Sequence, residues 1–127
     1  VALENQVLGK PESEDEAVEM LAFLSGREHK VLTGVALDYS GEITTTMSVT
    51  EVRFREIYPN EVPIYWQSGE PHDKAGAYGI QGIGGIFVEY ISGSYSGVVG
   101  LPVFETAELL SNAGLCILSL KSDRSHD

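Results

Sequence analysis

The residues best suited to chemistry lie in one glycine-rich stretch, SGEPHDKAGAYGIQGIGG, which runs from residue 68 to residue 85. Glycine is placed where the backbone turns with positive φ or approaches a ligand closely. A lysine such as Lys74 binds phosphate oxygens as a point charge, and the amide of Gln81 offers one acceptor and two donors. The stretch therefore predicts either a tightly packed turn or a small-ligand site that uses Lys74 and Gln81.

A second basic residue, Lys10, lies at a turn just before Pro11. The two lysines favour a bound small polyanion such as a triphosphate, although a solvated Lys10 at a strand end is the structural alternative. Known phosphate loops do not match, because no Lys-Ser/Thr pair follows spaced glycines. Phe87 also occupies the place of the third glycine in a dinucleotide fingerprint.

The other polar clusters favour structural explanations. Four acids fall in the first turn of an expected helix: Glu12, Glu14, Asp15 and Glu16. The helix dipole favours acids there in any protein. His29, His72 and His126 share no ligand spacing with one another or with Cys116, so we name no metal-ligating residue.

Composition limits the class of protein. The chain has 127 residues, is 43% apolar and carries a formal charge of −11, which predicts a single domain over residues 1–127 with a real core. The negative charge repels polyanions, so neither nucleic acid nor a membrane is expected as a partner. The lone Cys116, the lack of a signal peptide and the lack of a long apolar run predict a cytoplasmic protein.

The first half of the chain predicts strands and one helix. Two short strands are expected at residues 1–3 and 7–8. Ser13 and Glu16 have capping-box spacing, which predicts a helix over residues 14–25. The run 31–37 is apolar on both faces, which is typical of an inner strand.

The second half predicts a strand, two helices and a hairpin. Residues 42–57 alternate in polarity and change phase, which predicts a bulge near residues 50–51. A hairpin is expected around Gly93. Helices are expected over residues 61–66, capped by Asn60, and from Pro102 to Asn112. This order indicates an α/β or α+β fold with a mixed sheet.

Two segments, LGKPESEDEAVEMLAFLSGREHKVLTGVAL and the run from SGEPHDKAGAYGIQG to LPVFETAELL, closely resemble the Maf family of nucleoside triphosphate pyrophosphatases. The likeness extends from Val1 to about Asn112. The motif EPHDKAGAYGIQG is long and specific, and it resembles the branch that acts on thymidine and uridine triphosphates.

The resemblance implies an α/β fold with an elongated mixed β-sheet flanked by helices, similar to Maf and inosine triphosphatase proteins and often a homodimer. It implies hydrolysis of dTTP or UTP to the monophosphate and pyrophosphate, with Mg²⁺ or Mn²⁺ held largely through the triphosphate. By position, Lys10 matches the family's phosphate-binding lysine and Gln81 its base-discriminating glutamine. Asp73 and Lys74 match the site motif. Lys10 and Lys74 are thus expected to be catalytic, and Asp73 and Gln81 to bind substrate.

The sequence also departs from the family. The Ser-x-Ser-Pro-Arg-Arg segment and the Ala-Asp-Thr motif, whose aspartate is the general base of the family, are absent. The sequence therefore resembles the C-terminal two-thirds of a Maf protein, that is, an N-terminally truncated one, and we expect the 127-residue chain alone to be nearly inactive. Two alternatives stay open: a non-catalytic binding module linked to cell division, and a part with no independent function.

Overall fold

The computed structural model describes residues 1–115 and residue 118. Its strands are β1 (Ala2–Leu3), β2 (Gln6–Val7), β3 (Glu28–Tyr39), β4 (Glu42–Phe54) and β5 (Val88–Ser92). Its α-helices are α1 (Glu14–Leu24), α2 (Glu61–Gln67), α3 (Tyr95–Val99) and α4 (Val103–Asn112). Three short 3₁₀ helices break the glycine-rich stretch: η1 (Glu70–Asp73), η2 (Ala75–Ala77) and η3 (Ile83–Phe87).

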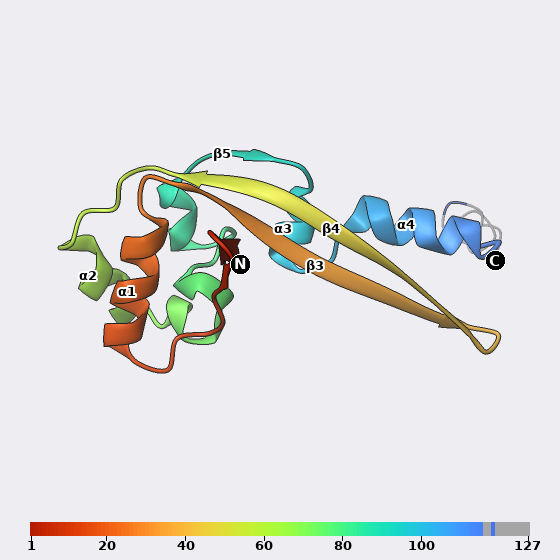
Figure 1. Cartoon of the computed structure of the whole chain (residues 1–127), viewed down its shortest axis with the longest axis horizontal. Coiled ribbons are helices and arrows are strands. Elements are labelled where there is room, and N and C mark those ends of the chain that lie inside the picture. Colours follow the sequence, from red (N-terminus) through yellow and green to blue (C-terminus); the bar gives the residue numbers. More distant parts are fainter. Residues whose placement is uncertain (116–117, 119–127) are drawn as a thin grey trace, which may run out of the picture.

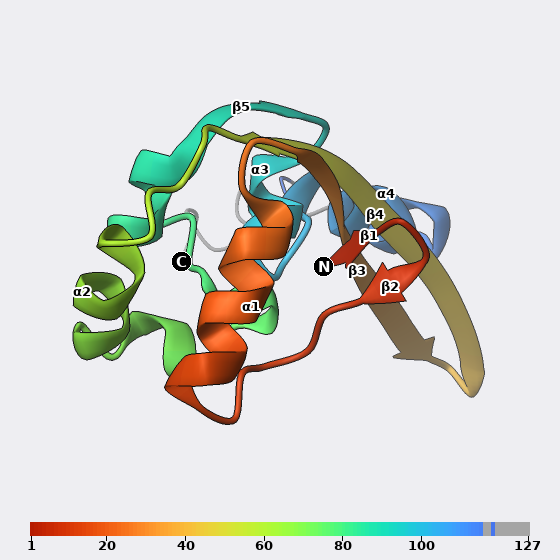
Figure 2. The same ribbon diagram turned by 60° about the vertical axis from the view of Figure 1, so that its left-hand side comes forward.

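The long hairpin of β3 and β4 runs along most of the molecule (Figure 1). Its turn falls at Ser40 and Gly41, which both have positive φ, as the twist of a two-residue hairpin turn favours. The sheet order is β2-β1-β3-β4-β5, so β3 is an inner strand, as expected. Figure 2 shows β1 and β2 beside β3. The elongated sheet with flanking helices confirms the predicted α/β fold class.

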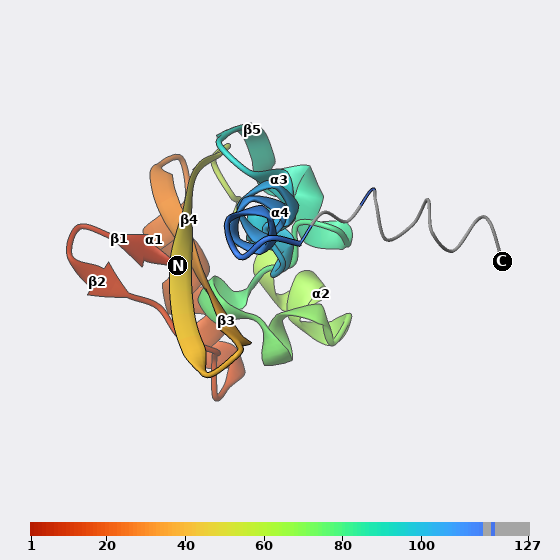
Figure 3. The same ribbon diagram turned by 90° about the vertical axis from the view of Figure 1, so that its right-hand side faces the viewer.

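The two faces of the hairpin have different environments. Figure 3 shows α3 and α4 on one side of the hairpin. On β4, every second residue from Ser48 to Phe54 is buried on this inner face. Met47 and Val49 point to the other face and are 60% and 49% exposed. The apolar side chains therefore change face along β4, as the sequence pattern indicated, while one regular backbone alternation runs through the whole strand.

The core lies at one end of the hairpin, between its base, α1, α2 and the glycine-rich stretch. Leu21 and Leu24 of α1 pack there with Val52 and Phe54 of β4. Helix α1 begins as predicted, because Ser13 Oγ accepts a hydrogen bond from the Glu16 N–H at 3.2 Å. The amphipathic spacing thus places α1 over the core.

Three local expectations were wrong. All described strand pairs are antiparallel, whereas a mixed sheet was expected. Pairing with β3 is continuous through Thr50 and Glu51, and the register shift lies at Arg53 and Phe54, opposite β5. The chain after Gly93 forms α3 and not a strand, because the Ser94 side chain caps the Gly97 N–H at 3.1 Å.

Asn60 was also misjudged. Its side chain makes no capping bond to α2. The carboxylate of Glu61 instead accepts a hydrogen bond from the Tyr58 N–H at 2.9 Å. The helix itself, from Glu61 to Gln67, and the later helix α4 lie where they were predicted.

No helix in the part of the chain that the structure describes is long and apolar enough to cross a bilayer. The expectations for Cys116 and His126 fall outside the described residues.

Candidate functional site

A pocket lies between the glycine-rich stretch and the base of the hairpin. Its volume is ≈ 460 Å³, within the range of roughly 300–1,000 Å³ typical of small-molecule sites. One wall comes from residues 70–82, and the other comes from β3 and α3. The polar side chains that line it are Thr33, Glu70, Lys74, Tyr78 and Gln81.

The structure brings two of the four predicted site residues to this pocket. Lys74 and Gln81 both line it. Asp73 lies beside it, and its Oδ1 is 3.1 Å from the Lys74 Nζ. This hydrogen bond and the charge of Lys74 hold the pKa of Asp73 below its usual value. The carboxylate therefore stays charged and occupies one donor of Lys74.

Lys10 is exposed and does not line the pocket. Its neighbour Gly9 is tied to the glycine-rich stretch, because the Gly9 carbonyl accepts a hydrogen bond from the Gly76 N–H at 3.0 Å. The charge of Lys10 also contributes to the lowered pKa of Asp73. Lys10 is thus an exposed residue outside the pocket whose charge reaches Asp73.

Glu70 and Tyr65 form the best-connected polar pair at the pocket. The Glu70 carboxylate accepts hydrogen bonds from the Ile83 N–H at 2.9 Å, the Gly84 N–H at 2.8 Å and the Tyr65 hydroxyl. The Tyr65 Oη in turn accepts the Gly79 N–H at 3.0 Å. Partial burial raises the pKa of Glu70, but these donors outweigh it, and the net pKa is lowered.

Two glycines let this contact form. A Cβ built on Gly82 would collide with the Glu70 carboxylate. A Cβ on Gly84 would lie 2.8 Å from the Gly79 carbonyl oxygen and closer still to the Tyr65 hydroxyl. Glycine at these two positions therefore serves close backbone approach, which answers one question raised by the sequence.

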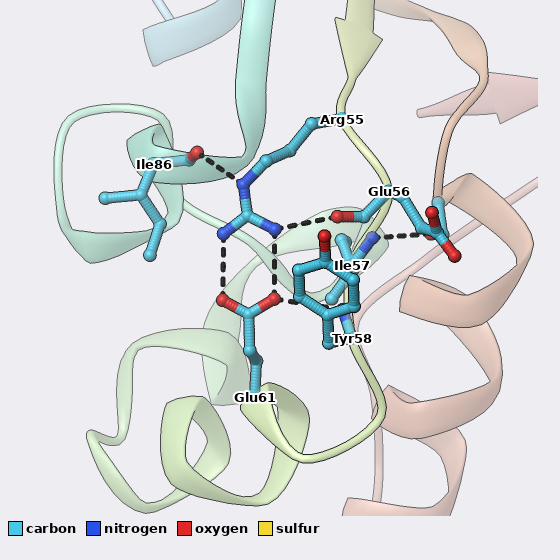
Figure 4. A network of polar contacts seen from close by, with 7 residues as sticks. Arg55, Glu56, Ile57, Tyr58, Glu61 and Ile86 are labelled. Carbon is cyan, nitrogen blue, oxygen red and sulfur yellow. Dashed lines mark hydrogen bonds and ion pairs between the residues drawn. The ribbon is translucent and has the colours of Figure 1, made fainter.

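A second network fixes the outer ends of these segments (Figure 4). Both guanidinium NH₂ groups of Arg55 donate to the Glu61 carboxylate, at 2.9 and 2.8 Å. The Arg55 Nε donates to the Ile86 carbonyl at 3.2 Å, and the Arg55 backbone N–H donates to the Phe87 carbonyl at 2.8 Å. One arginine thus joins the start of α2, which carries Tyr65, to the two residues that directly follow the glycine-rich stretch.

The opposite wall is fixed by long-range contacts. The His29 Nε2 and the Tyr78 Oη lie 2.7 Å apart in the core. The Thr33 hydroxyl donates to the Gly97 carbonyl at 2.7 Å and ties β3 to α3. The hairpin base therefore faces the glycine-rich stretch in a fixed position.

Sequence reasoning gave no role to Tyr65 or Glu70. One sequence feature could have indicated the role of Glu70. It is an acid ahead of several glycines, and the backbone N–H groups beside glycine are open to a carboxylate because glycine has no side chain. The role of Tyr65 depends on the position of α2 against this loop, which no local pattern specifies.

The described residues do not fit a metal held by protein side chains alone. No three His, Cys, Asp or Glu side chains among residues 1–115 and 118 are grouped so as to hold a metal ion. Asp73 is paired with Lys74, and the Glu70 carboxylate accepts backbone and hydroxyl donors. We therefore derive no step through a metal at these residues.

The structure is that of an α/β protein with a pocket lined by the short turns of residues 70–82 and by β3 and α3. Residues 1–113 match the Maf-like protein family. The chain belongs to the Maf family, as the sequence motifs predicted.

Several curated relatives are about half identical to the chain. A dTTP/UTP pyrophosphatase of Nitrosomonas europaea is 53% identical over 117 residues, which cover 92% of this chain and 56% of the relative. A dTTP/UTP pyrophosphatase of Alkalilimnicola ehrlichii is 54% identical over 110 residues, covering 87% and 54%. One of Colwellia psychrerythraea is 50% identical over 114 residues, covering 90% and 54%. The chain thus spans little more than half the length of these relatives.

Proposed function

We propose that the protein is a nucleoside triphosphate pyrophosphatase that hydrolyses UTP and dTTP to the monophosphate and pyrophosphate. The observation that carries this proposal is that Lys74 and Gln81 line one pocket of a Maf-family chain. A cation and a base-reading amide are the two groups that recognition of a nucleotide needs. The names of the curated relatives support the same substrates.

The lysines serve the phosphate end of the substrate. Lys74 contacts a phosphate oxygen from inside the pocket, and Lys10 contacts the triphosphate from the solvent side. Asp73 binds through Lys74, because it holds the ammonium in place by an ion pair of 3.1 Å. Cations preorganised around a transferring phosphoryl group stabilise its developing charge.

Gln81 serves the base end of the substrate. Its amide oxygen accepts the N3–H of uracil or thymine, and its amide N–H donates to O4. Cytosine reverses the pattern at these two positions, so it leaves polar groups of the site unpaired. The amide therefore favours uridine and thymidine nucleotides over cytidine nucleotides.

The proposal includes the surroundings of the enzyme. Mg²⁺ or Mn²⁺ accompanies the substrate through its triphosphate oxygens, and the protein works in the cytoplasm, as a monomer or a homodimer. Its partner is a small nucleotide and neither nucleic acid nor a membrane. The charge of −11 supports this choice, because it opposes binding to polyanionic surfaces.

The test uses a hybrid in which this chain replaces the matched part of the Nitrosomonas europaea relative. Pyrophosphate release is measured with UTP, dTTP and CTP. We expect Gln81→Glu to lower the ratio of kcat/KM for UTP to that for CTP by about tenfold or more, because the second acceptor suits the cytosine amine. Lys10→Ala is expected to lower kcat/KM by roughly 10² for both nucleotides.

Gln67→Glu is the matched control, because this substitution introduces the same charge at the exposed end of α2. It should leave the ratio unchanged. Equal ratios in wild type and Gln81→Glu would place base recognition elsewhere. A folded hybrid that releases no pyrophosphate would favour the binding module over the enzyme.

A further inference from the structure

The loop that carries Gln81 is held at both ends by one pair of side chains. Tyr65 accepts the Gly79 N–H at 3.0 Å, two residues before Gln81. Glu70 accepts the Ile83 and Gly84 N–H groups at 2.9 and 2.8 Å, two and three residues after it. The Tyr65 hydroxyl donates to Glu70, so the two anchors are one unit.

This loop needs an external anchor. Gln81 lies among Gly79, Gly82 and Gly84, and glycine gives the backbone more conformational freedom than any other residue. Between Gly79 and Gly85, turn hydrogen bonds run from the Gly82 N–H to the Gly79 carbonyl and from the Gly85 N–H to the Gly82 carbonyl, at 3.3 and 3.1 Å. The charge-assisted bonds to Glu70 are shorter, as bonds to an ionised acceptor are.

Tyr65 and Glu70 are themselves held firmly. Tyr65 is buried, and its ring packs edge-on against Phe87 at 5.3 Å between centroids. Burial raises the pKa of Tyr65, which keeps its hydroxyl protonated and able to donate. The Arg55–Glu61 pair fixes the start of α2, which carries Tyr65. The pair therefore transmits the position of the core to the loop.

We propose that Tyr65 and Glu70 are a positioning pair that sets the base preference of the pocket by fixing the loop around Gln81. This inference rests on the proposed role of Gln81 in reading the base. An amide distinguishes uracil from cytosine only where its own orientation is fixed, because a mobile glutamine can present either its oxygen or its NH₂ group. The pair supplies the order that the flanking glycines do not.

The test uses the complete 127-residue chain with Tyr65→Phe and Glu70→Gln. Tyr65→Phe keeps the ring that packs on Phe87 and removes the hydroxyl that bonds Gly79 and Glu70. Glu70→Gln keeps the shape but turns one acceptor into a donor facing two N–H groups. Amide hydrogen exchange by NMR reports on Gly79, Ile83 and Gly84, and titration with UMP and CMP gives the ratio of their Kd values.

We expect each variant to speed exchange at these amides at least about tenfold, since each loses hydrogen bonds that hold the loop. The preference for UMP over CMP should fall about tenfold toward equality, as base discrimination depends on a fixed partner. The double variant should add little to either single variant, because the two residues act as one unit.

Tyr90 and Glu28 give a matched control. The Tyr90 hydroxyl donates a hydrogen bond of 2.5 Å to a Glu28 carboxylate oxygen, and neither residue lines the pocket. Tyr90→Phe and Glu28→Gln should leave loop exchange and the UMP preference unchanged. Urea unfolding of each variant separates a loosened loop from a globally unstable chain.

Three results would overturn the inference. Unchanged exchange at Ile83 and Gly84 would show that the loop is ordered without Glu70. Faster exchange with an unchanged UMP preference would show that loop order does not set the preference. A wild-type chain that binds UMP and CMP equally would contradict both the inference and the proposed role of Gln81.

Discussion

A single buried histidine gives the core a built-in sensitivity to acid. His29 is 1% exposed, and its ring packs edge-on against Phe54 at 4.8 Å and Tyr78 at 5.4 Å. Burial lowers the pKa of His29 from 6.5 to about 4. The unfolded chain therefore binds a proton between pH 6.5 and pH 4 that the folded chain refuses.

We expect the free energy of unfolding to fall as the pH drops from 6.5 toward 4, and this contribution to level off below pH 4. The full loss is on the order of 3 kcal/mol, from 1.36 kcal/mol per pKa unit. His29→Gln should remove this part of the pH dependence in urea unfolding at pH 7 and pH 5. His72→Gln is the control, because His72 is exposed and stacks on Trp66 at the surface. A His29→Gln chain with the wild-type slope would contradict the prediction.

At the scale of elements, the hydrogen bonds of Arg55 fix the position of α2 relative to the sheet. Arg55 directly follows β4, and its bidentate ion pair with Glu61 holds the first residue of α2. Hydrogen bonds from Arg55 and from the Tyr58 N–H lower the pKa of Glu61 to about 2. Two parallel N–H···O bonds fix the guanidinium plane relative to the carboxylate plane, so the ion pair orients the two side chains as well as attracting them.

Glu61→Gln should lower the free energy of unfolding at pH 7 by about 1 kcal/mol, the upper end for a partly exposed ion pair. Since the folded pKa lies below the ordinary 4.5, this contribution is present above pH 4.5 and is lost as the pH falls toward 2. The gap between wild type and variant in urea unfolding should therefore close over that window.

Glu89→Gln is the matched control, because Glu89 meets Arg53 through a single contact of 3.2 Å at the exposed surface. Its effect should stay within about 0.5 kcal/mol at pH 7. Equal effects of the two variants would show that the contact with Arg55 adds nothing to the stability of α2.

The elements also show how far sequence patterns reach. The N-cap of α1 at Ser13 is local, and it was predicted from nearby residues. The α3 segment was wrongly predicted as a strand, because five residues are too few to show a helical period. The helix forms there because the Ser94 side chain caps it. In the pocket, the motif named Lys74 and Gln81, but the part played by Tyr65 arises from tertiary packing of α2.

At the scale of the whole molecule, the core is concentrated at one end. Val52 is fully buried at the base of the hairpin, whereas Val49, three residues earlier on the same strand, is 49% exposed on the outer face. The rest of the hairpin extends away from this core, with α4 beside it (Figure 1). Stability should therefore depend on which face of β4 is altered.

Val52→Ala and Val49→Ala remove the same atoms from one strand on opposite faces. We expect Val52→Ala to cost about 2 kcal/mol, because it leaves a cavity in the core. Val49→Ala should stay within about 0.5 kcal/mol, as is usual for surface positions. Urea unfolding at pH 7 measures both, and similar losses would show that the outer face is covered in solution.

The Tyr65–Glu70 contact also has a consequence for the order of folding. The hydrogen bonds from this pair to the loop, Tyr65 with Gly79 and Glu70 with Gly84, each join residues only 14 positions apart. The opposite wall depends on Thr33 reaching Gly97, 64 positions away. Closing the longer loop costs about 1 kcal/mol more chain entropy. The glycine loop can therefore reach its native shape early, while the pocket is completed late, when α3 docks on β3.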